Sequence, residues 1–349
     1  MNLDQRISAF SVWGNSLHKV LKKMEGELVA LSLPEEKFEA TINIAKSYNG
    51  WFSKESVVLS CKGILQFLSK VELEKFVRPY RNKMKEGVGK TVLIVMAGNI
   101  PMVGFHDLFC VLLSGNKALV KLSSDDNKLL PALCEMLIAI DPSFSDKIEF
   151  IERPSKNFEV VIATGNDNST RYFEYYFGKF PHVFRKNRFS IAVLNGQETE
   201  EQLKEFSKDI FLYYGLGCRN VSKIFVPKGY QFKTLIETFI VQLPYLENNK
   251  YQNNLEYQKA VMLLNKDPFI DAGFFFMKEN TSPFSSIAVL HYEQYENSKV
   301  IADFITEYQD KIQCVVGNYP QALHFGKAQF PELNDFADGV DTMKFLLSL

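Results

Sequence analysis

The pattern of hydrophobic and polar positions changes character near residue 90. Before that point, segments such as QRISAFSVWGNSLHKVLKKM and EEKFEATINIAKSY place apolar residues three and four positions apart. This spacing predicts helices over residues 1–81, and Pro34 stands at a plausible helix start. The basic run from Arg78 to Lys85 is expected to form a solvated connector.

From residue 91, short apolar runs alternate with longer helix-like segments. The predicted strands, in chain order, are TVLIVMAG, KALVKL, KIEFIE, FEVVIAT and FSIAVLNG. The helices expected between them are PMVGFHDLFCVLLSG, DNKLLPALCEMLIAI and NSTRYFEYYFGKF. This alternation predicts an α/β fold with a doubly wound, mostly parallel sheet, in which ligands bind beyond the carboxyl ends of the strands.

A second α/β unit is expected after Gly196. There a helix pattern, EQLKEFSKDIFLYYG, leads through GLGCRN into the strand SKIFVPKG, and further strand and helix patterns follow. We therefore predict a first domain over residues 1–196 and a second over residues 197–325. The tail, residues 326–349, is expected to return to the first domain or to contact another copy of the chain.

Composition excludes several classes of protein. The 349 residues contain 40 Lys and Arg against 41 Asp and Glu, and this balance argues against a general nucleic-acid binder. No apolar run reaches membrane-spanning length, and the first residues lack the pattern of a signal peptide. Five scattered cysteines without a C-x-x-C pair argue against disulfides and a metal site, and favour a reducing cytoplasm.

Two side chains are candidates for catalysis. Cys218 follows Gly215-Leu216-Gly217 at the end of a predicted helix, where a thiolate could serve as a nucleophile that forms thioesters. The alternative is a small buried hydrophobic residue. Asn99 directly follows a predicted strand, so its amide could donate to an oxyanion; the alternative is a turn former before Pro101.

Two further strand ends are candidates for binding a nucleotide. Lys121 closes KALVKL and is followed by the small polar residues Ser123 and Ser124; the alternative for Lys121 is a surface lysine. The third strand end carries Thr164, Gly165 and Asn166, where a helix start could bind phosphate through its N–H groups. The alternative for Asn166 is a plain N-cap, and the chain has no G-x-G-x-x-G fingerprint.

Taken in order, these segments resemble the aldehyde dehydrogenase superfamily. AGNIP stands where that family has P-W-N-x-P, and GNKALVKLSS resembles its G-N-x-V-V-x-K-P-S-E strand. VVIATGNDNS resembles the F-T-G-S segment, and GLGCRNVSKIFVP resembles the G-Q-x-C loop that carries the nucleophile. The resemblance implies an aldehyde-dehydrogenase-like fold with a Rossmann-like cofactor domain and a catalytic cysteine domain.

Within the superfamily the chain is most similar to the LuxC-type acyl-CoA reductases. Where hydrolytic members have E-L-G-G-K this chain has FRKNR, so Phe184 takes the position of the general-base Glu. The Glu that ends K-P-S-E is Ser124 here, which removes a carboxylate that would repel a 2′-phosphate and so favours NADPH. The E-I-F-G-P segment, whose Glu contacts the nicotinamide ribose in the family, is SPFSS here, with Ser282 near the position of that Glu.

The resemblance implies that Cys218 attacks a fatty acyl-CoA, that Asn99 and the Cys218 N–H hold the oxyanion, and that NADPH, with NADH as the alternative, reduces the thioester to an aldehyde. Lys121, Ser123, Ser124 and the turn Thr164, Gly165, Asn166 are then cofactor-binding residues. A homo-oligomer is expected, and an acyl-transferring partner enzyme is compatible with this chemistry. Two alternatives stay open: an acyl-phosphate reductase or other dehydrogenase of the same fold, and a catalytically silent binding scaffold.

Overall fold

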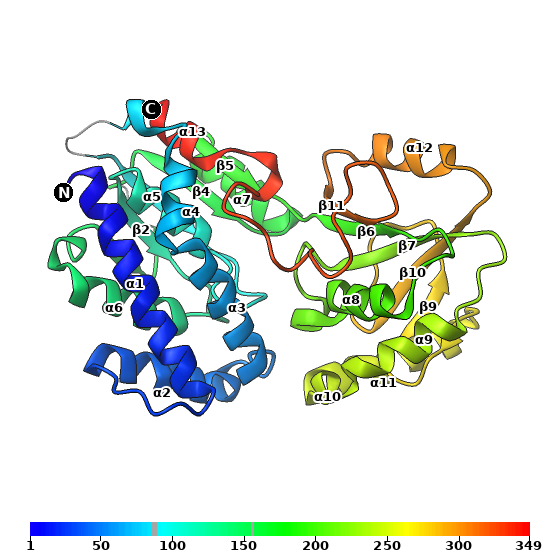
Figure 1. Ribbon diagram of the computed structural model, residues 1–349. Helices are drawn as coiled ribbons and strands as arrows, with labels where there is room; N and C mark the ends of the chain where they lie inside the picture. The colour runs from blue at the N-terminus through cyan, green and yellow to red at the C-terminus, as the bar shows by residue number, and fades with distance from the viewer. Residues whose placement is uncertain (85–88, 155–156) are drawn as a thin grey trace. The chain divides into compact units, whose positions relative to one another are not determined.

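The computed structural model describes residues 1–84, 89–154 and 157–349, which form two compact units (Figure 1). The first unit comprises residues 1–186 and 332–349, and the second comprises residues 187–331. Within the basic run, Arg81 pairs with Asp4 at 3.0 Å, whereas Lys85 lies outside the described residues. In the part of the chain that is described, no helix has the length and apolar character needed to cross a membrane.

The first unit is built on a parallel five-stranded sheet. Its strands are β1 Thr91–Val95, β2 Lys117–Lys121, β3 Ile148–Ile151, β4 Val160–Thr164 and β5 His182–Arg185. They lie in the order β3-β2-β1-β4-β5, and every pair in this order is parallel. The direction of winding therefore reverses between β1 and β4, which is the position where open α/β sheets bind ligands.

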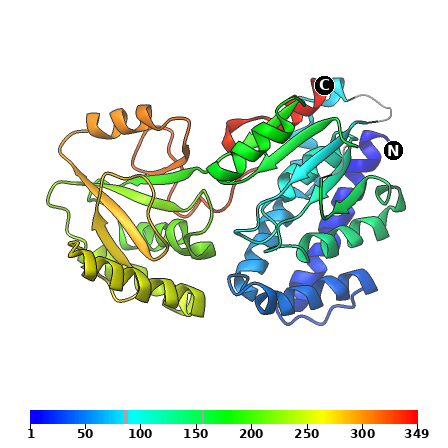
Figure 2. The same ribbon diagram turned by 180° about the vertical axis from the view of Figure 1, so that it is seen from behind.

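Helices cover both faces of this sheet. They are α1 Leu3–Met24, α2 Leu33–Tyr48, α3 Lys54–Phe67, α4 Lys70–Val77, α5 Phe105–Leu113, α6 Leu129–Ile140, α7 Asp167–Phe177 and α13 Thr342–Leu347. Val92 and Ile94 of β1 face the core shared with α1–α6, whereas Leu93 faces a smaller cluster with Phe173 and Phe177 of α7. Figures 1 and 2 accordingly show α7 and the amino-terminal helices on opposite faces of the sheet.

The second unit contains a six-stranded sheet in the order β11-β6-β7-β10-β9-β8. Its strands are β6 Phe189–Val193, β7 Val221–Pro227, β8 Ile270–Asp271, β9 Phe276–Glu279, β10 Val289–Tyr295 and β11 Ile312–Gly317. Its helices are α8 Glu200–Phe211, α9 Lys233–Phe239, α10 Leu243–Leu246, α11 Asn249–Asn265 and α12 Lys299–Glu307. Both views show α12 on the opposite side of this sheet from α8 (Figures 1 and 2).

The boundaries between the units differ from those expected from the sequence at 196 and 325. Strand β6, which we expected in the first domain, pairs with β7 and β11 and so belongs to the second sheet. Residues 326–331 stay with the second unit, where the Asp209 carboxylate accepts from the Gly326 and Ala328 N–H groups. The tail returns to the first unit from residue 332 onward.

Two regions carry elements that the hydrophobic pattern did not predict. Strand β5 is only four residues long and follows α7 closely, so it gives a weak local signal. In residues 233–265, helix α11 buries only Tyr251, Leu255 and Met262 of its 17 residues, so it lacks a clear apolar stripe.

Candidate functional site

The predicted binding residues of the first unit gather at one edge of its sheet. Asn99 lies in the loop after β1, whereas Lys121 and Thr164 are the last residues of β2 and β4, and these three strands are neighbours. Val95 of β1 lies opposite Lys121 on one side and opposite Ala163 on the other. The sequence-predicted polar positions therefore meet at the carboxyl edge beside the reversal of strand order.

The loop that carries Asn99 is held tightly against the loop after β2. A Cβ atom added to Gly98 would lie 2.6 Å from Ser123 Oγ, so only glycine allows this close approach. The Met102 N–H donates to Asp126 Oδ2 at 2.6 Å, and Met102 takes a left-handed conformation with φ 54°. These contacts fix the loop while Asn99 itself is exposed.

The loop after β2 presents its polar groups to solvent. Lys121 is half-buried, and its Nζ lies 3.5 Å from the Leu122 carbonyl oxygen, at the outer limit of a hydrogen bond. Ser124 is exposed, whereas Ser123 is half-buried and accepts from the Asp125 N–H at 3.3 Å. An ammonium and two hydroxyls at this place suit the hydroxyl and phosphate groups of a nucleotide.

The loop after β4 leads directly into α7. Asn166 Oδ1 accepts from the Ser169 N–H at 2.8 Å, so the Asn166 side chain serves as the N-cap of this helix. The Gly165 N–H donates to the Arg185 carbonyl at 3.2 Å, and a Cβ on Gly165 would lie 2.7 Å from that of Ser169. The Thr164 hydroxyl is half-exposed at the strand end.

Strand β5 carries Phe184, which the family resemblance aligns with the general-base position. Phe184 is half-buried and contacts the rings of Phe173 and His182. The next residue, Arg185, is buried, and its guanidinium makes two hydrogen bonds to the Asp107 carboxylate at 2.7 and 3.1 Å. Burial alone would raise the pKa of Asp107, but Arg185 outweighs that effect and holds it below its usual value.

Cys218 lies in the second unit, in the turn between α8 and β7, and differs from the other cysteines in exposure. All five are free thiols; Cys218 is exposed, Cys314 is half-buried, and Cys61, Cys110 and Cys134 are buried. Burial raises the pKa of Cys61 to about 12 and that of Cys110 well above its usual range. An accessible sulfur is the first requirement of a nucleophile, and the three buried thiols do not meet it.

Asn220 fixes the geometry of the Cys218 turn. Its Nδ2 donates to the carbonyls of Asp209, Ile210 and Leu212 at the end of α8, at 3.3, 3.1 and 2.8 Å. Its Oδ1 accepts from the Gly217 N–H at 2.8 Å, and its own N–H donates to the Gly217 carbonyl. The buried Asn220 side chain thus links the end of α8 to Gly217, and Cys218 lies between Gly217 and Asn220.

The backbone before the turn is strained. Tyr213 and Tyr214 have φ angles of 52° and 57°, and Gly215 continues the left-handed conformation at 78°. Such a conformation costs about 1–3 kcal/mol for each bulky residue and persists only where packing enforces it. Here Tyr214 stacks on Tyr245 at 4.6 Å, and the Tyr245 hydroxyl accepts from the Tyr213 N–H at 2.9 Å.

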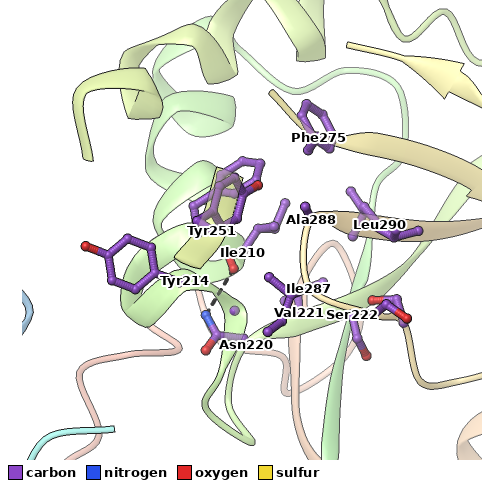
Figure 3. A pocket seen from close by; sticks show the side chains of 15 residues that line it. Ile210, Tyr214, Asn220, Val221, Ser222, Tyr251, Phe275, Ile287, Ala288 and Leu290 are labelled. Carbon is purple, nitrogen blue, oxygen red and sulfur yellow. Dashed lines mark hydrogen bonds between the residues drawn. The ribbon is translucent and has the colours of Figure 1, made fainter. Parts of the chain in front are cut away.

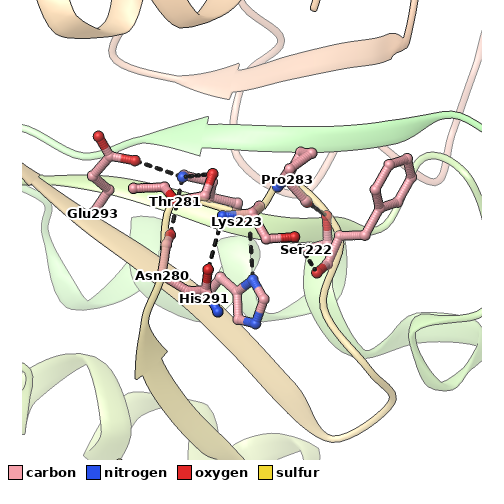
Figure 4. Close-up of polar contacts among 9 residues, drawn as sticks. Ser222, Lys223, Asn280, Thr281, Pro283, His291 and Glu293 are labelled. Atoms are coloured by element: carbon pink, nitrogen blue, oxygen red, sulfur yellow. Dashed lines mark hydrogen bonds and ion pairs between the residues drawn. The ribbon is translucent and has the colours of Figure 1, made fainter.

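A buried lysine anchors the residues just before SPFSS, the segment that the resemblance aligns with E-I-F-G-P. Lys223 Nζ donates to the carbonyls of Asn280 and Thr281 at 3.0 and 2.8 Å and to Glu293 Oε2 at 2.6 Å (Figure 4). The Lys223 side chain is fully buried in β7, and burial lowers its pKa against the opposing effect of Glu293.

Two neighbouring side chains complete this anchor. Ser222 Oγ donates to the Pro283 carbonyl at 2.8 Å, and the His291 ring lies 3.0 Å from the Ser282 carbonyl (Figure 4). Sequence reasoning missed Lys223, Ser222 and His291. A lysine inside the apolar run VSKIFVP was the available signal, because an unpaired lysine is rarely buried.

Comparison with known proteins assigns the chain to a family. The LuxC acyl-CoA reductase family model matches residues 37–243, more than half of the chain. No curated protein sequence matches it.

Solved structures of aldehyde dehydrogenases share the fold. Aldehyde dehydrogenase 21 from Physcomitrella patens, solved with succinate, has a TM-score of 0.61 at 12% identity, over 97% of this chain and 84% of that one. The Δ-pyrroline-5-carboxylate dehydrogenase from Mycobacterium tuberculosis has a TM-score of 0.58 at 12% identity, over 97% and 70%.

At such identities the structural likeness shows the fold alone, and it agrees with the aldehyde-dehydrogenase-like architecture that the sequence predicts. The family model adds the activity class, an oxidoreductase that acts on an acyl or aldehyde group. The chain belongs to the LuxC family of acyl-CoA reductases.

Proposed function

We propose that the chain reduces an acyl-CoA to an aldehyde through a thioester on Cys218, with NADPH as the hydride donor. The observation that carries this proposal is the exposed thiol of Cys218 on a turn that Asn220 holds in one conformation. Membership of the acyl-CoA reductase family supports the substrate class.

In the first half-reaction, the Cys218 thiolate attacks the carbonyl carbon of the acyl-CoA. A carbon–sulfur bond forms, and the oxyanion is stabilised by the Asn99 side chain and the Cys218 N–H. The bond between the acyl carbon and the CoA sulfur then breaks, and CoA leaves as a thiolate. The product is an acyl thioester on the enzyme.

In the second half-reaction, the acyl carbon is reduced. When bound, the nicotinamide cofactor supplies the hydride that this carbon requires. Collapse of the resulting hemithioacetal oxyanion breaks the bond to Cys218, releases the aldehyde and regenerates the thiolate. Phe184 supports this outcome, since an apolar ring in place of a carboxylate leaves no base there to activate water for hydrolysis.

The polar edge of the first sheet fits a nicotinamide dinucleotide. The Lys121 ammonium, the Ser123, Ser124 and Thr164 hydroxyls and the backbone N–H groups at the start of α7, just after Gly165 and Asn166, supply donors for ribose and phosphate groups. Ser124 favours NADPH because it places no carboxylate against a 2′-phosphate.

The Ser124→Glu variant tests this cofactor preference. It should lower kcat/KM for NADPH at least tenfold and leave kcat/KM for NADH unchanged; equal losses with both cofactors would contradict this assignment.

The test is intact mass spectrometry of the protein after addition of decanoyl-CoA, first without and then with NADPH. We expect one acyl adduct on the Cys218 peptide, none on the Cys314 peptide, and discharge as decanal when NADPH is added. The Cys218→Ala variant should form no adduct. Release as free decanoic acid in buffer alone would indicate a hydrolytic enzyme, and the absence of any adduct would favour an acyl-phosphate substrate or a silent scaffold.

A further inference from the structure

A serine of β6 holds the backbone carbonyl of Cys218. Ser190 is fully buried, and its Oγ donates to the Cys218 carbonyl oxygen at 3.0 Å. The same Oγ lies 3.1 Å from Sγ of Cys314 on β11. A hydroxyl has one proton, and here that proton goes to a carbonyl, which can only accept. The Cys314 thiol is therefore the donor to Ser190, and the three residues form a hydrogen-bonded relay, the serine relay.

The sheet is irregular on both sides of Ser190. Cys314 lies opposite Ser190 in the pairing of β6 with β11, and this pairing skips Gln313. In the pairing of β6 with β7, Val221 lies opposite Ser190, and Ser222 is skipped. An extra residue of this kind re-aims the side chains around it, and such irregularities are over-represented next to active sites. Two of them meeting at one serine indicate that the fold specifies where the Ser190 hydroxyl points.

Two peptide groups flank the Cα atom of Cys218, and each is tied to the protein. In the group before it, the Gly217 carbonyl accepts from the Asn220 N–H at 3.0 Å. Asn220 is itself fixed by the end of α8, where its Nδ2 donates to the Ile210 carbonyl at 3.1 Å (Figure 3). In the group after it, the Cys218 carbonyl accepts from Ser190. Because planar peptide groups leave only φ and ψ free at Cys218, these two ties set the direction in which the thiol leaves the backbone.

We propose that Ser190 is a positioning residue for the nucleophile, and that the Cys314 thiol orients the Ser190 hydroxyl for this task. The inference rests on the proposed function and adds to it the device that aims Cys218 at the acyl carbon. Without the Ser190 bond, the peptide group after Cys218 can rotate, and the sulfur spends less time in the attacking geometry. A displacement of about 1 Å at the reacting atoms can lower a rate about 100-fold.

The test compares four variants of the full-length protein. Ser190→Ala removes the serine relay, and Ser207→Ala is its matched control. Ser207 is also fully buried in the second unit, and its hydroxyl likewise accepts one hydrogen bond, from Gln242, and donates one, to the Lys204 carbonyl. Cys314→Ala removes the thiol that donates to Ser190, whereas Cys314→Ser keeps a donor at this place.

The measurement is the rate of Cys218 acylation by decanoyl-CoA without cofactor, followed by rapid quench and intact mass over a range of decanoyl-CoA concentrations. We expect Ser190→Ala to lower the limiting rate at least tenfold, while the half-saturating concentration stays within about twofold because the substrate contacts are unchanged. Cys314→Ala should lower the limiting rate about three- to tenfold, and Cys314→Ser and Ser207→Ala should stay within about twofold of the wild type.

Thermal unfolding separates positioning from a loss of stability. Ser190→Ala and Ser207→Ala each lose one buried hydroxyl with two partners, so their thermal midpoints should fall by similar amounts. A limiting rate of Ser190→Ala within twofold of the wild type would overturn the proposal, and so would equal rate losses in Ser190→Ala and Ser207→Ala. If Ser190→Ala does not fold, the Cys314 pair decides, because equal rates in Cys314→Ala and Cys314→Ser overturn the serine relay.

Failure of the proposed function gives a different result. In that case the wild type forms no acyl adduct, and hydrogen exchange of the peptide that contains Gly217 to Asn220 tests the serine relay without any substrate. Faster exchange of this peptide in Ser190→Ala than in Ser207→Ala then supports the serine relay in a protein of other chemistry. Equal exchange in the two variants overturns it.

Discussion

Single residues in this chain derive their roles from their surroundings more than from their type. Asn99 and Asn220 carry the same amide, yet Asn99 is exposed beyond a strand end while Asn220 is buried and bonded to three carbonyls. The surroundings of Asn99 leave its side chain at the surface, whereas those of Asn220 make it hold a turn. The same contrast separates exposed Cys218 from the buried thiols.

The oxyanion role proposed for Asn99 predicts a kinetic effect without a structural one. Asn99→Ala should slow acylation of Cys218 by about 10²–10³-fold, the usual effect of losing one oxyanion donor. Because the side chain is exposed, the thermal midpoint should change little. Stopped-flow acylation and thermal unfolding test this, with Asn265→Ala on exposed α11 as the control; a rate within twofold of the wild type would exclude the role.

Asp209 predicts how stability depends on pH. Burial raises the pKa of this carboxyl to about 7 from an ordinary 3.8, although two N–H groups stabilise its charge. A raised pKa means that the folded state keeps a proton that the unfolded state has lost, so this contribution to stability is complete below about pH 4 and disappears as pH rises through 7.

Between pH 5 and pH 8 the free energy of unfolding should therefore fall by about 3 kcal/mol on account of Asp209. In Asp209→Asn this part of the fall should vanish, even though the variant is less stable overall because an amide cannot accept both N–H bonds. Urea unfolding followed by circular dichroism gives the free energy of unfolding of the wild type and of Asp209→Asn at both pH values. If this free energy falls by the same amount in the two proteins, the assignment is wrong.

At the scale of elements, strands of the second sheet position a loop that lies far away in sequence. The Lys223 side chain of β7 and the His291 ring of β10 contact the segment 280–283, and Glu293 of β10 pairs with Lys223. The three residues thus connect a central strand, its neighbour and the segment that the family resemblance associates with the cofactor. The segment depends on side-chain contacts for its position.

Removing Lys223 should release this segment. Lys223→Met leaves Glu293 and two carbonyls without their donor, and we expect a loss of about 2–3 kcal/mol, below the full value for a buried pair because Glu293 is partly exposed. The KM for the cofactor should rise more than kcat falls. Lys228, just beyond the end of the same strand, forms an exposed pair with Glu296, so Lys228→Met should cost less than about 1 kcal/mol; equal effects of the two would refute the anchor.

At the scale of the whole molecule, the chain crosses from the first unit to the second and back. Arg185 joins the ends of the first unit, because it bonds Asp107 of α5 and also donates to Thr342 Oγ1 at 2.8 Å in the returning tail. Tyr80 adds a second tie, with its hydroxyl donating to Asp341 Oδ2 at 2.8 Å. The tail is thereby part of the first unit's core.

Arg185→Met should unfold the first unit more readily. It leaves the Asp107 carboxylate buried without its partner, which costs about 3–5 kcal/mol. Both tryptophans, Trp13 and Trp51, lie in the first unit, so tryptophan fluorescence follows that unit alone in urea. The midpoint by fluorescence should fall for Arg185→Met and stay within error for Lys186→Met, whose pair with Glu174 is exposed. An unchanged midpoint in Arg185→Met would show that the tail is held by other contacts.

The sequence alone determined the alternation of strands and helices, because short apolar runs and three- to four-residue spacing are local signals. It also placed Asn99, Lys121 and Thr164 at or just beyond the ends of strands, and topology then brought these strand ends to one edge. Only the tertiary structure decided the unit boundary at β6 and the buried roles of Lys223 and Arg185. Lys223 meets Glu293 70 positions away and Arg185 meets Asp107 78 positions away, so no local pattern encodes these pairs. Their energies come from burial and from partners that only folding provides.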